Sequence, residues 1–322
     1  PDLVEFCEAH VPLLEAEVHA VPLLTRMADW YKLALDDGAN ALDCLTRAFS
    51  LRPRDKRLEE QWMQQAREVG DWQTVLDALE VQCEAATEKD LIYFRGRRAS
   101  IMAAEQKDVQ AGIDELLRLR GGELPGDIDS LRMLCGFARE SGQSNQLADA
   151  LEALHAQLGA GEADEILKLY YELAELCEKE LKDVDRARVA LRYAQKSDRD
   201  PLRALRWQER LLDGTDNTEA LLEVLADLVD PTIQNADVRD DLLKKGKLHH
   251  QLGEYAEALE CYERALDHSR HDPGAIAGLE ALVDQGQCVG RAGKILEPIY
   301  TVNNQHEKLA WLLGHRLDEV AD

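Results

Sequence analysis

The amino-acid sequence predicts an all-α protein, organised as a solenoid of stacked antiparallel helix hairpins. Three observations support this prediction. Ala, Leu, Glu, Asp, Arg and Gln dominate the composition, and most of these lose little rotamer freedom on a helical backbone. The nine prolines and twenty glycines lie mostly between the apolar-periodic stretches. A pattern of two hairpins also recurs about every 72 residues, which is difficult to produce by chance.

Complete hairpins follow one another along the chain. One starts near Pro22 and turns at residues 36–38, and the next one turns at residues 70–72. The clearest hairpin spans residues 246–267 and has a tight turn at Gly253. Its second helix places three residues on one face, at intervals of four and three: Ala258, Tyr262 and Ala265.

This last hairpin resembles a tetratricopeptide repeat. The family pattern of a small residue, glycine, alanine, an aromatic residue, alanine and a closing proline is matched by Gly246, Gly253, Ala258, Tyr262, Ala265 and Pro273. An earlier copy is matched by Ala28, Ala41, Leu45, Ala48 and Pro53. The resemblance covers essentially the whole chain. It implies a right-handed superhelical solenoid whose first helices line a concave groove, and a protein-binding role.

Two series of equivalent positions alternate along the chain. The first is Ala41, Gly112, Ala187 and Ala258, with separations of 71, 75 and 71 residues. The second is Leu3, Val75, Leu147, Leu221 and Ala292, with separations of 72, 72, 74 and 71 residues. Gly112 replaces the usual alanine, at a cost in helix propensity of up to about 1 kcal/mol. Arg98 and Lys245 occupy places where the family usually buries leucine.

The two ends of the sequence fit half-hairpins. Residues 1–12 match a second helix with no first helix before it, and residues 305–320 match a first helix with no second helix after it. We therefore expect about eight complete hairpins between two half-hairpins. Residues 1–322 are interpreted as a single solenoid domain, a fragment of a longer repeat array that could self-associate through its open ends.

Charge and cysteine usage narrow the functional classes. The net charge is −25, from 63 acidic and 38 basic residues, so phosphate backbones and anionic lipids are repelled. We expect no nucleic-acid partner and no membrane insertion, since no run of eighteen apolar residues exists. The seven cysteines are widely spaced without a CxxC pair. This indicates buried small side chains in a reducing compartment, and the cytoplasm fits best.

The predicted binding residues lie on the first helices of the hairpins, because these line the groove. A partner protein or peptide would contact them, although ordinary solvated helix positions are the alternative for most. The candidates are Thr25, Asp29, Lys32, Tyr93, Ser100, Lys168, Tyr171, Glu175, Glu178, Leu243, Lys247 and His250.

Other clusters were weighed as sites. The histidines at 249, 250, 268 and 271 lack a recognisable metal-ligand spacing, so no metal is predicted. Arg95, Arg97 and Arg98 could dock an acidic partner or offset nearby carboxylates on the next repeat, and the second is favoured. Asp240 and Asp241 open a helix, where negative charge is favourable. Trp30, Trp62, Trp72, Trp207 and Trp311 are interpreted as packing residues.

The function predicted from these features is a protein–protein interaction scaffold. We expect no catalytic residue and no cofactor, because no nucleophile, phosphate-loop or paired-acid motif stands out. The alternative is a regulatory sensor module whose superhelix changes pitch on binding a small peptide or ligand. A helical-toroid enzyme is a third alternative. Such an enzyme needs convergent acids and a closed, aromatic-rich cavity, and the sequence indicates neither.

Overall fold

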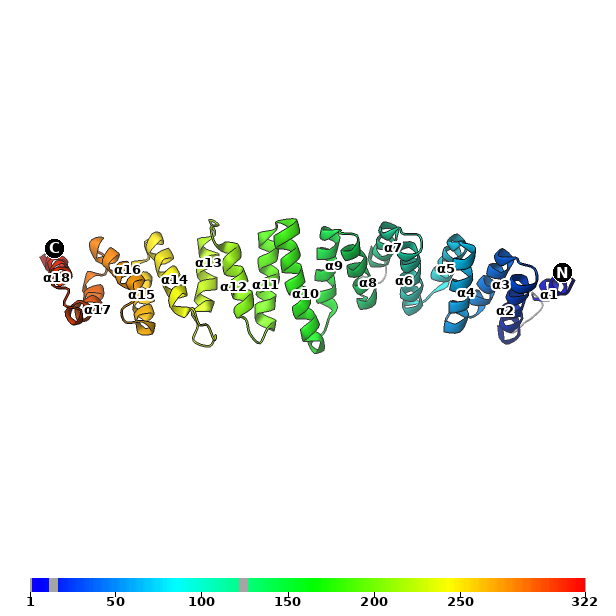
Figure 1. Cartoon of the computed structure of the whole chain (residues 1–322), viewed down its shortest axis with the longest axis horizontal. Helices are drawn as coiled ribbons and strands as arrows, with labels where there is room; N and C mark the ends of the chain where they lie inside the picture. Colours follow the sequence, from blue (N-terminus) through cyan, green and yellow to red (C-terminus); the bar gives the residue numbers. More distant parts are fainter. Residues whose placement is uncertain (1, 12–16, 122–126, 322) are drawn as a thin grey trace. The chain divides into compact units, whose positions relative to one another are not determined.

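The structure is a computed structural model that describes residues 2–11, 17–121 and 127–321. Within these ranges every regular element is a helix, which confirms the predicted all-α class. The chain divides into two compact units, Pro1–Glu162 and Ala163–Asp322, and neighbouring helices within each unit lie side by side in chain order (Figure 1).

The described part of the first unit consists of helices joined by short turns. They are α1 (Asp2–His10), α2 (Glu17–Ala34), α3 (Gly38–Leu51), α4 (Lys56–Val69), α5 (Trp72–Ala85), α6 (Glu88–Ala104), α7 (Val109–Gly121), α8 (Ile128–Glu140), α9 (Ser144–Gln157) and the short 3₁₀ helix η2 (Ala160–Glu162).

The second unit continues the same pattern. Its elements are α10 (Ala163–Leu176), the π-helical turn η3 (Cys177–Leu181), α11 (Val184–Ser197), α12 (Leu202–Leu212), α13 (Thr218–Leu228), α14 (Val238–Leu252), α15 (Tyr255–His268), α16 (Pro273–Asp284), α17 (Val289–Val302) and α18 (His306–Ala321).

The helices pair into hairpins, each with a first helix (helix A) and a second helix (helix B). In the first unit the pairs are α2–α3, α4–α5, α6–α7 and α8–α9, and in the second they are α10–α11, α12–α13, α14–α15 and α16–α17. Helix α1 packs on α2, and α18 packs on α16 and α17. Eight hairpins between two half-hairpins among the described residues confirm the predicted repeat. The right-handed twist and the single continuous domain stay predictions.

Polar caps and glycine set the turns. Gly253 ends α14 with a φ of 78°, a left-handed conformation that glycine adopts without strain. The Asp37 carboxylate accepts a hydrogen bond from the Asn40 backbone N–H (3.0 Å) and so caps α3. One boundary differs from expectation, because α2 begins at Glu17 and includes Pro22. The proline lies early in the helix, where its missing N–H removes a single hydrogen bond.

The equivalent positions of the repeat are buried, with one exception. Exposed fractions are 1% or less at Ala41, Ala187 and Ala258, and 6% or less at Val75, Leu147, Leu221 and Ala292. Leu3 is 58% exposed, so this member of the series is not buried. Helix α1 lies at the end of the first unit and packs against α2, which leaves Leu3 uncovered (Figure 1).

A buried cluster of charges closes the α6–α7 hairpin. Arg98 is 8% exposed, so a charged side chain does occupy the place where the family buries leucine. Its guanidinium donates to Glu115 on α7 (2.8 Å) and to the carbonyl oxygen of Leu76. Arg95 donates to the same carboxylate (2.6 Å). The register taken from the resemblance therefore holds at Arg98, and the buried charge is neutralised from within the unit.

An aromatic ring between two glycines closes the α14–α15 hairpin. Tyr262 of α15 is 1% exposed. A Cβ atom added at Gly246 of α14 would lie 2.7 Å from its ring, and one added at Gly278 of α16 would overlap the ring. Glycine is required at position 112 for a similar reason, since an added Cβ would lie 2.8 Å from the carbonyl oxygen of Ala99. These glycines allow close helix contact, which alanine would prevent.

The cysteines are unpaired thiols. Six are buried and Cys288 is half-buried, which confirms their use as small apolar side chains. Burial, followed by the neighbouring Glu8 carboxylate, raises the pKa of Cys44 to about 12. Cys288 differs from expectation because it lies just before α17 in a left-handed conformation, with a φ of 51°.

Candidate partner-binding face

Three hollows lie between successive helices A. One of about 350 Å³ lies between α2 and α4, one of about 440 Å³ between α4 and α6, and one of about 600 Å³ between α10–η3 and α12. Sequence-predicted residues line all three: Thr25 and Asp29 the first, Ser100 the second, Glu175 and Glu178 the third. We use the name helix-A face for the linings of these hollows, in each unit taken by itself.

Three other predicted residues link neighbouring hairpins instead of lining a hollow. The pairs are Lys32 with Glu68 (2.5 Å), Tyr93 with Glu59 (2.5 Å) and His250 with Gln285 (2.9 Å). Burial, followed by the hydrogen bond to Glu59, raises the pKa of Tyr93 to about 12. These side chains therefore hold one hairpin against the next.

The remaining predicted residues fall into two groups. Lys168 on α10 and Lys247 on α14 are exposed and line none of these hollows. Tyr171 is buried, its hydroxyl donates to Asp198 (2.9 Å), and Leu243 packs at the edge of the second unit's core. Tyr171 thus packs behind the lining of the third hollow and offers little exposed surface to a partner.

A stripe of arginines on α12 lines the third hollow and was not predicted. Arg203, Arg206, Trp207 and Arg210 lie three, four and seven positions apart, so they share one helical face. The helical spacing of these four residues is the sequence pattern that indicates the stripe. The interpretation of Trp207 as a packing residue does not use that pattern. With Lys179, four cations and the two carboxylates Glu175 and Glu178 line this hollow. Lys179 pairs with Glu175 (2.5 Å) and Arg206 pairs with Asp241 of the next hairpin (2.6 Å), so most of the positive charge of the lining is neutralised.

Each of these side chains is held in place by a neighbour. The Arg203 guanidinium lies 4.1 Å from the centre of the Tyr171 ring. The Trp207 indole N–H donates to Glu178 (2.6 Å), and Arg210 donates to both oxygens of the same carboxylate (2.9 and 3.0 Å). Among the residues that the structure describes, Arg203 forms no ion pair, so its N–H donors are left for a ligand.

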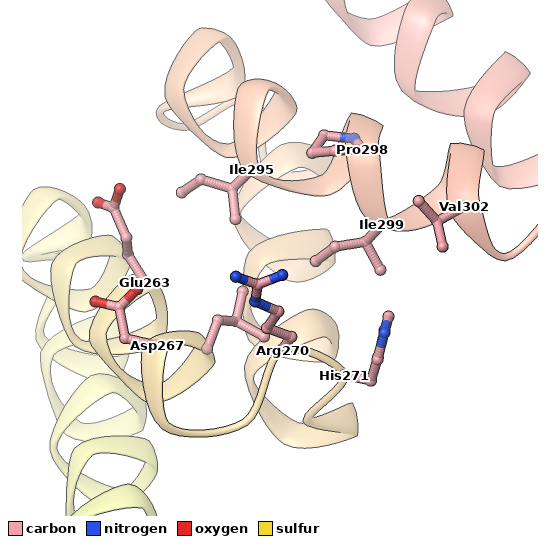
Figure 2. A pocket seen from close by; sticks show the side chains of 9 residues that line it. Glu263, Asp267, Arg270, His271, Ile295, Pro298, Ile299 and Val302 are labelled. Carbon is pink, nitrogen blue, oxygen red and sulfur yellow. The ribbon is translucent and has the colours of Figure 1, made fainter.

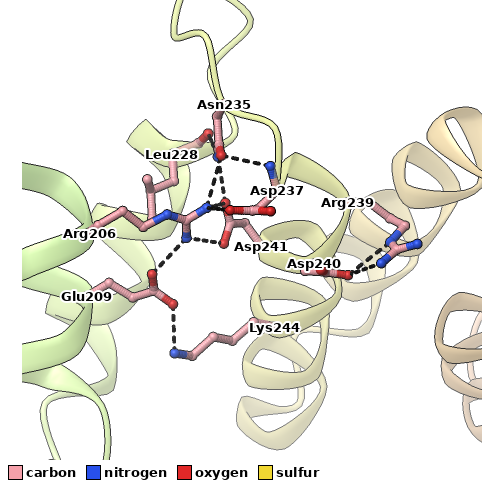
Figure 3. Close-up of polar contacts among 9 residues, drawn as sticks. All are labelled: Arg206, Glu209, Leu228, Asn235, Asp237, Arg239, Asp240, Asp241 and Lys244. Atoms are coloured by element: carbon pink, nitrogen blue, oxygen red, sulfur yellow. Dashed lines mark hydrogen bonds and ion pairs between the residues drawn. The ribbon is translucent and has the colours of Figure 1, made fainter. Parts of the chain in front are cut away.

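Arg206 links α12 to the next hairpin through a network shown in Figure 3. It donates to both oxygens of Asp241 (2.6 and 2.8 Å) and to Glu209 (2.8 Å). Lys244 donates to Glu209 (2.9 Å), and Asn235 donates to Asp241 (2.6 Å). Asp241 does lie in the first turn of α14, as predicted, but it is buried and serves mainly as the partner of Arg206.

The basic cluster on α6 is neutralised internally. Besides their bonds to Glu115, Arg95 and Arg98 pair with Glu80 (2.9 and 3.0 Å), and Arg97 pairs with Glu59. These carboxylates belong to the same hairpin and the preceding one, whereas the sequence suggested the following one. The structural reading of the cluster is thereby confirmed.

The histidines make ordinary polar contacts. The His249 ring nitrogen lies 2.6 Å from Glu254. His271 lines a hollow between helices α15 and α17. No group of three or more metal-ligating side chains gathers anywhere in the described ranges. Trp62 confirms the packing prediction, since it is 1% exposed and stacks on Phe49 at 4.2 Å. No described helix is long and apolar enough to cross a lipid bilayer.

Comparison with family models matches one segment of the chain. Residues 242–272 match the sequence model of the tetratricopeptide repeat family, on the hairpin that carries the resemblance. No curated protein matches the chain.

Several solved structures are similar at low identity. A chain of the Naa15/Naa10 complex bound to HypK-THB shares 14% identity and a TM-score of 0.38, covering 94% of this chain and 51% of that one. This chain therefore spans about half the length of that protein. The C-terminal part of a TPR repeat-containing protein from Cytophaga hutchinsonii shares 15% identity and a TM-score of 0.33, covering 79% and 98%. A tetratricopeptide repeat protein from Parabacteroides merdae shares 13% identity and a TM-score of 0.30, covering 92% and 98%.

Proposed function

We propose that this tetratricopeptide repeat protein is a scaffold that binds a partner protein or peptide along its helix-A face. The observation that carries the proposal is that predicted residues line each of the three hollows between successive helices A. The proposal assigns a binding role and no catalytic step.

The hollow between α10–η3 and α12 is the principal contact in this proposal. Its arginines are held before any ligand arrives, by Tyr171, by Glu178 and by Asp241. Binding there costs less side-chain entropy than ordering free arginines would. Trp207 adds a flat apolar surface of the kind that is enriched at interfaces.

Site-specific photo-crosslinking tests the face that is used. A photoreactive amino acid placed at Lys168 or Glu175, both exposed on α10, is expected to crosslink to a partner in an extract of the source cells. The matched control is Lys196, an exposed lysine on helix α11 of the same hairpin. Crosslinks from Lys196 with none from α10 would overturn the assignment. Tyr171 is a poor target, since its burial would confuse binding with stability.

The alternative, a sensor that changes superhelix pitch, has no specific observation in its favour. Two further expectations stay part of the proposal. A cytoplasmic location agrees with the unpaired, mostly buried thiols. Self-association through the ends agrees with exposed apolar side chains on α1 and α18, which are Leu3, Phe6, Leu313 and Leu317.

A further inference from the structure

Helix α17 has two apolar faces. One is fully buried, and the other is half-buried at Ile295 and Ile299 and exposed at Pro298 and Val302. The core face comprises Val289, Ala292, Leu296 and Tyr300, all 2% exposed or less. The second face is a stripe at positions three, four and seven apart: Ile295, Pro298, Ile299 and Val302. Val302 is 73% exposed, and Pro298 is also exposed. A surface helix normally shows one apolar stripe and a polar opposite face, so the second stripe is unusual.

The stripe forms one wall of a hollow of about 400 Å³ between α15 and α17 (Figure 2). Leu266 of α15 contributes apolar surface to the lining. This hollow lies between two helices B, whereas the other three lie between helices A. It is therefore separate from the helix-A face.

Acceptors flank the stripe at its Ile295 end. Glu263 and Asp267 lie one turn apart on α15 and border the hollow beside Ile295 (Figure 2). Glu263 pairs with the exposed Arg291 (3.2 Å), whereas Asp267 forms no ion pair with any described residue. The carbonyl oxygen of Lys294 lacks its usual helical donor, because Pro298 has no N–H.

From this arrangement we infer that the α15–α17 hollow docks an amphipathic helix of a partner protein, with an apolar stripe and flanking lysine or arginine residues. An apolar helix face seated in an apolar groove is a recurrent mode of recognition. The partner's cations would meet Glu263 and Asp267. An acidic residue would meet Arg270 in the middle of the hollow or His271 nearer Val302 (Figure 2).

The charge of the chain favours this occupant over a second copy. A net charge of −25 attracts a cationic helix and raises its association rate, whereas a second acidic chain would have to overcome charge repulsion to reach this hollow. The inference goes beyond the proposed function, because it assigns a second surface on the opposite helices and a chemical class of partner.

A labelled peptide provides the test. The probe is a fluorescein-labelled helical peptide of leucines at i, i+3, i+4 and i+7 with lysines elsewhere, and its binding to the full chain is followed by fluorescence anisotropy. We expect Val302→Asp and Asp267→Lys each to weaken binding at least tenfold. Both residues are exposed, so circular dichroism should be unchanged. The matched control is Val189→Asp, at a 53% exposed valine on helix B α11.

Several outcomes would overturn the inference. The first is that Val302→Asp binds the probe as tightly as Val189→Asp does, because attraction to the acidic surface would then suffice. Equal binding of a scrambled peptide of the same composition, or no binding of the probe, would also reject it. A concentration-dependent dimer in sedimentation that Val302→Asp abolishes would assign the hollow to a second copy instead.

Discussion

The α6–α7 and α14–α15 hairpins have the same architecture and are closed by different chemistry. In α14–α15, the hairpin that matches the family model, Tyr262 fills the space between Gly246 and Gly278. In α6–α7 the corresponding interior holds Arg98 and Glu115 as a buried ion pair. Apolar contacts tolerate small adjustments of geometry, whereas a buried pair requires both partners. The repeat therefore conserves a shape, and several kinds of side chain can supply it.

The largest effect that separates the two hairpins should come from Glu115→Leu. The change leaves Arg95 and Arg98 with only the more exposed Glu80 as a shared carboxylate. Breaking a buried pair costs about 3–5 kcal/mol, and the remaining pairs with Glu80 place the expected loss at the lower end of this range. Urea unfolding followed by circular dichroism measures it. The double variant Arg98→Leu/Glu115→Leu should recover most of the loss, because both members of that pair become apolar. A loss no greater than that of Asp114→Leu, at the exposed neighbour, would contradict the interpretation.

The second effect concerns the glycine-lined ring. Gly278→Ala places a methyl group against Tyr262, and overpacking of this kind costs about 1–3 kcal/mol, more than the helix propensity of alanine returns. Gly136→Ala, inside α8 where nothing lies within 4 Å, is the matched control and should stabilise by up to about 1 kcal/mol. Equal responses of both variants in urea would show that Tyr262 moves freely aside.

Lowering the pH should reduce the stability of the α6–α7 hairpin through Glu115. Burial acts to raise the pKa of its carboxyl, but hydrogen bonds from Arg95 and Arg98 outweigh burial and hold it below the usual 4.5. A group with a lowered folded pKa contributes stability above its unfolded value and loses it as the pH falls. The difference in the free energy of unfolding between the wild type and Glu115→Gln should thus become smaller below about pH 4.5. Urea titrations at stepped pH would show it, and a constant gap would exclude this origin.

The smallest effect is expected at an exposed link between helices. Lys32 and Glu68 are each 41% exposed, and water and salt screen such a pair. We expect Lys32→Gln to leave the urea midpoint unchanged within error. A clear loss would mean that exposed links stabilise the array as strongly as the buried cluster.

The fold could be predicted because its causes are local. The turn glycine, the small residues and the aromatic ring all lie within 246–267, and the same spacing recurs along the chain. The exposed Leu3 was missed because its burial depends on a neighbouring helix, which local pattern does not report. Gly278 was missed because its role appears only once Tyr262 of the preceding hairpin is placed against it.

The candidate site was predictable in part. Helical spacing placed Asp29, Ser100, Glu175 and Glu178 on the first helices of the hairpins, and all four line hollows between helices A. Their binding role stays a prediction. It did not find Arg206, whose partner Asp241 is 35 residues away in the next hairpin. A contact of that range depends on how two hairpins stack, and sequence periodicity alone does not specify it.

Contacts such as Arg206–Asp241 have a consequence for how the array can evolve. Each joins a side chain to one residue about a hairpin further on, so the correct neighbour is specified by charge as well as by shape. Transposing two hairpins would keep every helix, yet Arg206 would lose Asp241 and Lys244 would lose Glu209 at the new junctions. The hairpins of this chain are thus alike in form but not interchangeable in position.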